Sequence, residues 1–193
     1  MKRWIVSGVA ACAALLWIGA MPVHAKVTAI DFTSKKPYGS FRNGDYVLWE
    51  GRVRGELAPS ESIPDIDKPA RNARGMIEYS SRIMLFMPAD LAKANGTLLV
   101  DIPNRGNAYS RALYNSPRDE PYLAGNIQQG TGFLEDRGFI SLEVNWELGK
   151  GADLPTFTDA QGKKRFVEGV GFAIVRDTAD FFAHASADTA GTA

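Results

Sequence analysis

Apolar residues along this chain follow two periods, one typical of strands and one typical of a helix. Runs with strand-like patterns, bounded by Gly, Pro, Asn and Asp, lie at 46–57, 76–87, 98–102 and 139–146. In the last run, Ile140, Leu142, Val144 and Trp146 share one face. The continuous apolar run at 98–102 predicts a strand covered on both faces of its sheet.

The clearest helical pattern covers Arg165 to Ala185. Its apolar stripe consists of Val167, Val170, Gly171, Ile174, Thr178, Phe181, Phe182 and Ala185. A short helix capped by Gly138 is expected within 132–138, and one helical turn at 91–94. Polar stretches at 58–73, 104–130 and 149–164 are expected to be loops. The run at 46–57 predicts one or two antiparallel strands. Further along the chain strands and helices alternate, which predicts parallel pairing and right-handed crossovers there, and the sequence as a whole predicts an α/β fold with a mixed sheet and flanking helices.

The first 25 residues have the pattern of a secretory signal peptide. Lys2 and Arg3 precede an apolar run of about 17 residues, and small residues at Val23 and Ala25 predict cleavage after Ala25. A membrane anchor is a weaker interpretation, because such a run is short for a span and no stop-transfer pattern follows. We therefore expect residues 26–193 to form an exported protein, periplasmic or extracellular, without a stable membrane span.

Composition narrows the chemistry of the mature chain. Removal of Lys2 and Arg3 leaves 20 basic against 22 acidic residues, a net charge of −2, which argues against binding nucleic acid. Removal of Cys12 and His24 leaves no cysteine and one histidine, His184. The mature chain alone therefore cannot build a disulfide, a thiol nucleophile or a Cys/His zinc site. No cofactor or metal ion is expected.

The loop after the 98–102 strand is the candidate functional segment. Acyl transfer requires backbone N–H groups directed at a developing oxyanion, and such a donor often comes from a loop at this position. Pro103 has no N–H, so the candidates are Asn104, Arg105, Gly106 and Asn107. The alternative is a tight turn at the end of the strand, which Asn and Gly also favour.

Other residues that could carry chemistry have simpler interpretations. His184 lies near the end of a helix and is expected to be structural. Arg176 and Asp177 are adjacent on that helix and are expected to make separate contacts. Glu143, Glu147 and Asp153 could form a glycosidase pair, and Asp65 and Asp67 could bind Ca²⁺, but solvated loop acids are far commoner than either site.

Several segments in order resemble a group of bacterial proteins with an α/β-hydrolase domain. They are Gly55–Pro59, Asp65–Gly75, Glu78–Ser80, Leu99–Asn107, Gly132–Gly138 and Gly171–Asp177 with Phe181 and Phe182. Together they extend from about Arg42 to His184. The sequence departs from the expected pattern at Lys68–Ala70 and at His184.

This resemblance implies that residues 26–193 are the N-terminal part of an α/β-hydrolase domain. In that family, the helix that 167–185 resembles leads into the strand with the nucleophile elbow, and this sequence stops before it. The resemblance therefore implies that no catalytic nucleophile, acid or base is present in this chain. The parent protein would hydrolyse a small ester-like substrate, and the chain alone would be inactive. The alternative function is a non-catalytic exported module that binds a ligand or another chain.

Overall fold

The main element of the fold is a six-stranded sheet. The computed structural model describes residues 26–115 and 130–190, with the backbone alone at 112 and 185–190. The strand order is β1-β2-β3-β5-β4, and β6 pairs with β3 beside this series. The strands are β1 (Lys26–Phe41), β2 (Gly44–Leu57), β3 (Ile77–Pro88), β4 (Leu98–Asp101), β5 (Ile140–Val144) and β6 (Ala152–Asp153).

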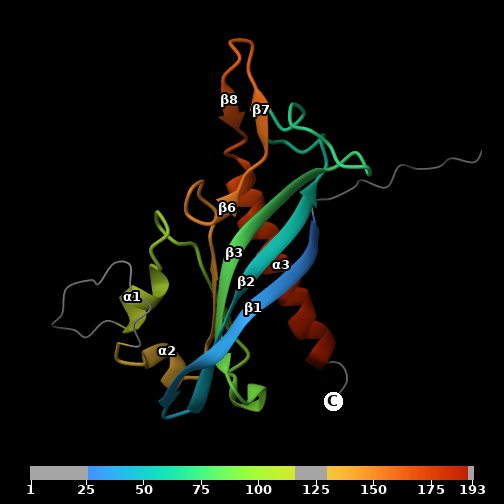
Figure 1. Ribbon diagram of the computed structural model, residues 1–193. Coiled ribbons are helices and arrows are strands. Elements are labelled where there is room, and N and C mark those ends of the chain that lie inside the picture. The colour runs from blue at the N-terminus through green and yellow to red at the C-terminus, as the bar shows by residue number, and fades with distance from the viewer. Residues whose placement is uncertain (1–25, 116–129, 191–193) are drawn as a thin grey trace, which may run out of the picture.

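Antiparallel pairing dominates the sheet. The pairs β1–β2, β2–β3, β3–β5 and β3–β6 are all antiparallel, and only β4–β5 is parallel. A separate hairpin of β7 (Thr156–Thr158) and β8 (Lys164–Phe166) extends beyond one end of the sheet (Figure 1). The antiparallel pairing predicted at 46–57 is therefore correct, and the parallel pairing predicted for the later strands is correct for β4 and β5.

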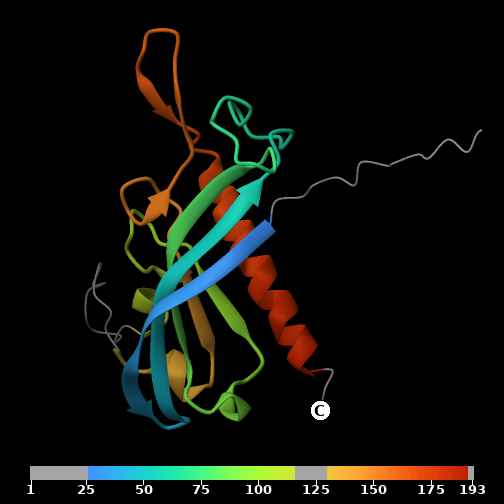
Figure 2. The ribbon, with the colours of Figure 1, turned by 45° about the vertical axis from the view of Figure 1, so that its right-hand side comes forward.

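One long helix covers one face of the sheet. Helix α3 (Val170–Ala190) crosses behind β1, β2 and β3 and packs against them and against β5 (Figures 1 and 2). The short helices α1 (Ser110–Asn115) and α2 (Phe133–Asp136) lie at one end of the opposite face, and a single 3₁₀ turn, η1 (Leu91–Lys93), follows β3. No helix of the described residues covers the rest of that face.

The main hydrophobic core fills the space between α3 and the sheet. Alternate residues of β2 and β3 point into it, including the fully buried Val53, Leu57, Ile77 and Ile83. Helix α3 contributes its buried stripe, with Val170, Ala173 and Ile174. A smaller cluster of Leu48, Met84 and Phe86 lies apart from this core.

The expected α/β-hydrolase fold class is contradicted by this architecture. Strand accounts for 43% of the structure and helix for 19%, so the protein is mostly β. A doubly covered α/β sheet needs a helix after most strands, but here β1, β2 and β3 follow one another as antiparallel neighbours without any helix between them. Strand alternation identifies β2 and β3 but carries no information on whether helices cover both faces of their sheet, and this is why the predicted α/β class is wrong.

The positions of individual strands and helices agree better with the sequence pattern than the fold class does. The expected strands at 46–57, 76–87 and 139–146, the turn at 91–94 and the short helix within 132–138 are all present. Strand β4 also forms, but it lies at the edge of the sheet, and its residues 98–100 are only half-buried rather than covered on both faces. The last helix begins at Val170 and not at Arg165, because 164–166 form β8.

Two sequence predictions fall on residues outside the description. The first is the signal peptide at 1–25. The second is the polar segment 104–130, of which residues 116–129 are not described. The division at Ala25 stays a prediction. Among the described residues, no helix combines the length and the apolar character that a membrane crossing requires.

Candidate functional site

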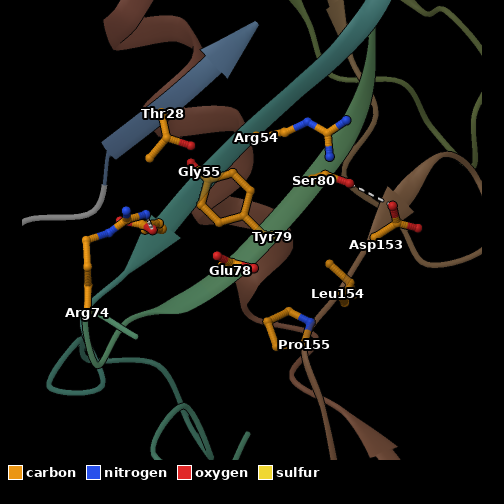
Figure 3. Close-up of a pocket in the computed structure, with 11 residues that line it drawn as sticks. Thr28, Arg54, Gly55, Arg74, Glu78, Tyr79, Ser80, Asp153, Leu154 and Pro155 are labelled. Carbon is orange, nitrogen blue, oxygen red and sulfur yellow. Dashed lines mark hydrogen bonds and ion pairs between the residues drawn. The ribbon is translucent and has the colours of Figure 1, made fainter. Parts of the chain in front are cut away.

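A groove of about 430 Å³ opens on the sheet face that α3 leaves uncovered. Its lining comes from β1, β2 and β3, from Arg74 in the segment before β3, and from β6 with the two residues that follow it (Figure 3). A volume of this size is typical of sites for small molecules. The groove is lined by Thr28, Arg54, Gly55, Glu56, Arg74, Glu78, Tyr79, Ser80, Asp153, Leu154 and Pro155.

The pairing register explains why polar side chains gather here. Strands β2 and β3 are antiparallel, with Arg54 opposite Ser80 and Glu56 opposite Glu78. Because residues opposite each other in a sheet point to the same face, these four side chains project together. Their neighbours in the sequence, such as Val53, point into the core under α3. The alternation of polar and apolar residues thus assigns the polar set to the uncovered face.

Most charges around the groove are already paired. Arg54 donates through Nε to Oδ2 of Asp31 on β1 at 2.9 Å. Arg74 pairs with Glu56, and these hydrogen bonds hold the pKa of the buried Glu56 carboxyl below its usual value. Asp153 of β6 accepts a 2.7 Å hydrogen bond from the Ser80 hydroxyl. Arg52 completes that group by pairing with Asp153.

Among the charged side chains of the lining, Arg54 and Glu78 keep functional groups available to a ligand. Within the described residues, the two Nη nitrogens of Arg54 make no hydrogen bond, since its only contact with a carboxylate uses Nε. Glu78 accepts one hydrogen bond, 2.9 Å from Nδ2 of Asn72, and forms no ion pair with any described residue. The Arg54 side chain is also 57% exposed. The groove therefore offers one donor fork and one carboxylate to a ligand.

The floor of the groove is held to α3 by a buried hydrogen bond. The Tyr79 hydroxyl donates to Oδ2 of Asp177 at 2.8 Å, and Tyr79 is 4% exposed. Burial and the nearby Asp177 carboxylate raise the pKa of the Tyr79 hydroxyl, which keeps it protonated. Asp177 also accepts a 2.8 Å hydrogen bond from Nε of Arg176. Arg176 also lies 3.8 Å from Glu61, so Arg176 and Asp177 make the predicted separate contacts and in addition pair with each other.

The predicted oxyanion loop forms a compact turn away from the groove. Asn104 and Asn107 exchange two backbone hydrogen bonds of 3.0 Å each, and the two residues between them have positive φ, 53° at Arg105 and 79° at Gly106. These values are characteristic of a two-residue type I′ hairpin turn. The Asn104 and Asn107 N–H groups are used within the turn, and so Arg105 and Gly106 are the two amides still open to a ligand.

The ends of β4 and β5 meet beside this turn. Nε1 of Trp146 donates to the carbonyl oxygen of Pro103 at 2.9 Å, and a Cβ on Gly106 would lie 3.3 Å from Cβ of Lys150. No residue of this turn lines the groove. The assignment of Asn104, Arg105, Gly106 and Asn107 to an oxyanion loop stays a prediction.

The remaining sequence candidates do not form one site. Nδ1 of His184 lies 2.7 Å from the carbonyl oxygen of Asp180, and no described serine contacts the ring. Asp65 accepts a hydrogen bond from Lys68, and Glu143 is buried while Asp153 lines the groove. Among the described residues, no three His, Cys, Asp or Glu side chains are placed to hold a metal ion.

A buried charged cluster, which the sequence analysis did not find, lies under α1 and α2. Arg111 is 4% exposed, donates to Glu135 at 2.8 Å and lies 3.8 Å from Glu143 through Nε. Its guanidinium stacks 3.8 Å above the Phe86 ring, and Asp101 accepts a 2.8 Å hydrogen bond from the backbone N–H of Ser110 at the start of α1. Burial raises the pKa of Glu143 to about 7.

This charged cluster is structural in the geometry seen here. It joins α1 and α2 to the sheet through Asn115, whose Nδ2 donates to Glu135 and whose Oδ1 accepts from the Leu134 N–H. In a single sequence, Arg and Glu residues indicate surface positions, so no local signal could have identified them as buried.

Comparisons of this chain with protein-family models, curated proteins and solved structures found no match.

Proposed function

We propose that this chain is a non-catalytic binding module of an exported protein, and that the polar groove holds a small polar molecule. The observation that carries the proposal is a concave site of small-molecule size whose lining has free donor and acceptor groups, on Arg54 and Glu78. A polar ligand would complete the hydrogen bonds of these side chains, which water otherwise satisfies.

The packing of α3 supports a module that needs no catalytic machinery. For such a module, the apolar stripe of the last helix has to be covered by the sheet at hand. Val170, Ile174 and Thr178 are fully buried against that sheet. The groove lies on the opposite face, so most of its lining is distinct from the residues packed under α3, and Tyr79 and Leu154 contribute to both.

The second candidate function is part of an acyl-bond hydrolase that acts on a small ester-like substrate. One observation favours it: the amides of Arg105 and Gly106 lie at the tip of a turn that follows a strand end, where an oxyanion could be bound. No nucleophile–base pair involves His184 within the described residues. We expect no ester hydrolysis by the purified chain, and turnover that is lost in His184→Ala would contradict this.

A bulky side chain placed in the groove tests whether the groove binds a ligand. Thr28 is exposed on β1 and lines the groove, so Thr28→Trp would occupy ligand space without removing a charge. The purified chain is screened by protein NMR against a library of small polar molecules, including amino acids, sugars and polyols. We expect ligands to shift the resonances of Ser80 and Asp153, and we expect Thr28→Trp to abolish these shifts.

The control for this test is Thr158→Trp, at an exposed position on β7 outside the groove. It should leave binding unchanged. If no molecule of the library shifts groove resonances, or if binding survives Thr28→Trp, the proposed function is wrong.

A further inference from the structure

The two free groups of the groove carry opposite charges. On the basis of the proposed function, the chemical identity of these two groups narrows the class of molecule that the groove would bind. Asp31 already balances the charge of Arg54, but it contacts only Nε and leaves the Nη fork open. Among the described residues, only the neutral amide of Asn72 donates a hydrogen bond to Glu78. A ligand with one charge would satisfy one of these groups and leave the other to water.

The register places the two groups within reach of one small ligand. Arg54 on β2 lies opposite Ser80, and Glu78 precedes Ser80 by two residues on β3. Arg54 and Glu78 are therefore diagonal neighbours on one face, with Cα atoms roughly 7–8 Å apart. No ion pair joins them directly, and Figure 3 shows both beside the same space. The arrangement can be bridged by a molecule with both charges.

The chemistry of the two groups determines which charge goes where. A guanidinium fork binds a carboxylate through two parallel N–H···O bonds, whereas a carboxylate such as that of Glu78 accepts from an ammonium group. We propose that the groove binds a free amino acid as its zwitterion, with the ligand carboxylate on the Nη atoms of Arg54 and the ligand ammonium on Glu78.

The apolar part of the lining suggests where the ligand side chain lies. Leu154 and Pro155 form the side of the groove that follows β6 (Figure 3). Apart from Gly55, they are the only described residues of the lining without a hydroxyl or charged group. An aliphatic amino acid would place its side chain against them, since apolar contact there costs no hydrogen bond.

Three matched probes test the zwitterion directly by isothermal titration of the purified chain. L-leucine carries both charges, 4-methylpentanoate lacks the ammonium group, and 3-methylbutylamine lacks the carboxylate. We expect L-leucine to bind and each analogue to bind at least tenfold more weakly, since each loses one charge-assisted contact. Equal binding of all three probes would overturn the zwitterion assignment and leave the proposed function standing.

Variants assign each charge to its residue. Glu78→Gln should weaken L-leucine binding at least tenfold while leaving the affinity for 4-methylpentanoate unchanged. Arg54→Gln should weaken L-leucine binding at least tenfold and leave the affinity for 3-methylbutylamine unchanged. Arg54→Lys should retain part of the affinity for L-leucine, because lysine keeps the charge but lacks the two Nη donors. Circular dichroism establishes that each variant is folded.

Matched controls lie outside the groove. Arg165→Gln on β8 and Asp180→Asn on α3 remove one charge of each sign at distant exposed positions, and both should bind L-leucine normally. If the Arg54 and Glu78 variants bind L-leucine as tightly as the wild type does, the assignment of these residues is wrong. If no probe binds and the library screen also finds nothing, the proposed function fails as well.

Discussion

The hydroxyl of Tyr79 on β3 donates a 2.8 Å hydrogen bond to Oδ2 of Asp177 on α3, 98 residues later in the chain. This bond ties the only long helix of the described structure to the central part of the sheet. It lies directly beneath the groove, because Tyr79 also contributes to the lining. Stability of the fold and shape of the candidate site therefore depend on the same side chain.

Tyr79→Phe should lower the free energy of unfolding by about 1–2 kcal/mol, because the buried Asp177 carboxylate loses a donor while keeping its contact with Arg176. Urea unfolding followed by circular dichroism measures the change. Tyr114→Phe, at a residue that is 49% exposed, is the control and should change stability by less than about 0.5 kcal/mol. Equal stability of Tyr79→Phe and wild type would show that the hydrogen bond contributes nothing.

Gly55→Ala should destabilise the protein because the Tyr79 ring lies against the Gly55 backbone. A Cβ at Gly55 would lie 2.1 Å from Cζ of Tyr79, and the ring cannot move away without breaking its bond to Asp177. Overpacking of this kind costs about 1–3 kcal/mol. The same substitution made in a Tyr79→Ala background should cost clearly less, since the clash is then absent. Equal costs in the two backgrounds would contradict this account.

Removal of Arg111 should be more damaging than removal of any surface arginine. Arg111→Met leaves Glu135 and Glu143 buried without their counter-charge, and breaking such a pair typically costs about 3–5 kcal/mol. The Arg42 side chain is 89% exposed, so Arg42→Met should lower the free energy of unfolding by less than about 1 kcal/mol. Thermal and urea unfolding compare the two variants, and similar losses in both would refute a special role of the buried cluster.

The buried Glu143 should make stability depend on pH. Burial raises the pKa of Glu143 from 4.5 to about 7, with Arg111 opposing and Asp101 reinforcing the shift. Between these two values, the folded state holds a proton that the unfolded state has released. The free energy of unfolding contributed by Glu143 should therefore fall as pH rises from about 4.5 to 7, by roughly 3 kcal/mol, and stay constant above that range.

Glu143→Gln should remove this component of the pH dependence, because the amide does not titrate. Urea unfolding at pH values from 4.5 to 8 measures the difference between variant and wild type, in which the contributions of other groups cancel. The exposed Glu168→Gln should follow the wild-type profile. If the stability of Glu143→Gln changes with pH as that of the wild type does, Glu143 is not the source of this pH dependence.

The sequence predicted most strands but not how they pair. Alternation from Tyr46 to Leu57 and from Met76 to Met87 identifies β2 and β3 because side-chain direction in a strand is a local property. It could not reveal β1, whose middle carries Lys35, Lys36 and Pro37, residues typical of loops and edge strands. Register and strand direction depend on partners that are distant in sequence, and so the predicted α/β architecture was wrong.

The candidate site illustrates the same division. The sequence indicated the strand end at Asn104–Asn107, where Asn and Gly do form a tight turn, because turn geometry depends on adjacent residues. It did not indicate the groove, which is made by Arg54, Glu78 and Asp153 from strands far apart in the chain.

The sequence by itself determined where β2, β3, β4 and β5 lie and which of their side chains share a face, since both follow from backbone geometry over a few residues. Only the tertiary structure decided that β2 and β3 pair in a register that places Arg54 and Glu78 beside one space, and that Glu143 is buried next to Arg111 of α1. The physical reason is that hydrogen-bond partners and solvent exposure are set by contacts between distant segments, and local periodicity carries no information about those contacts.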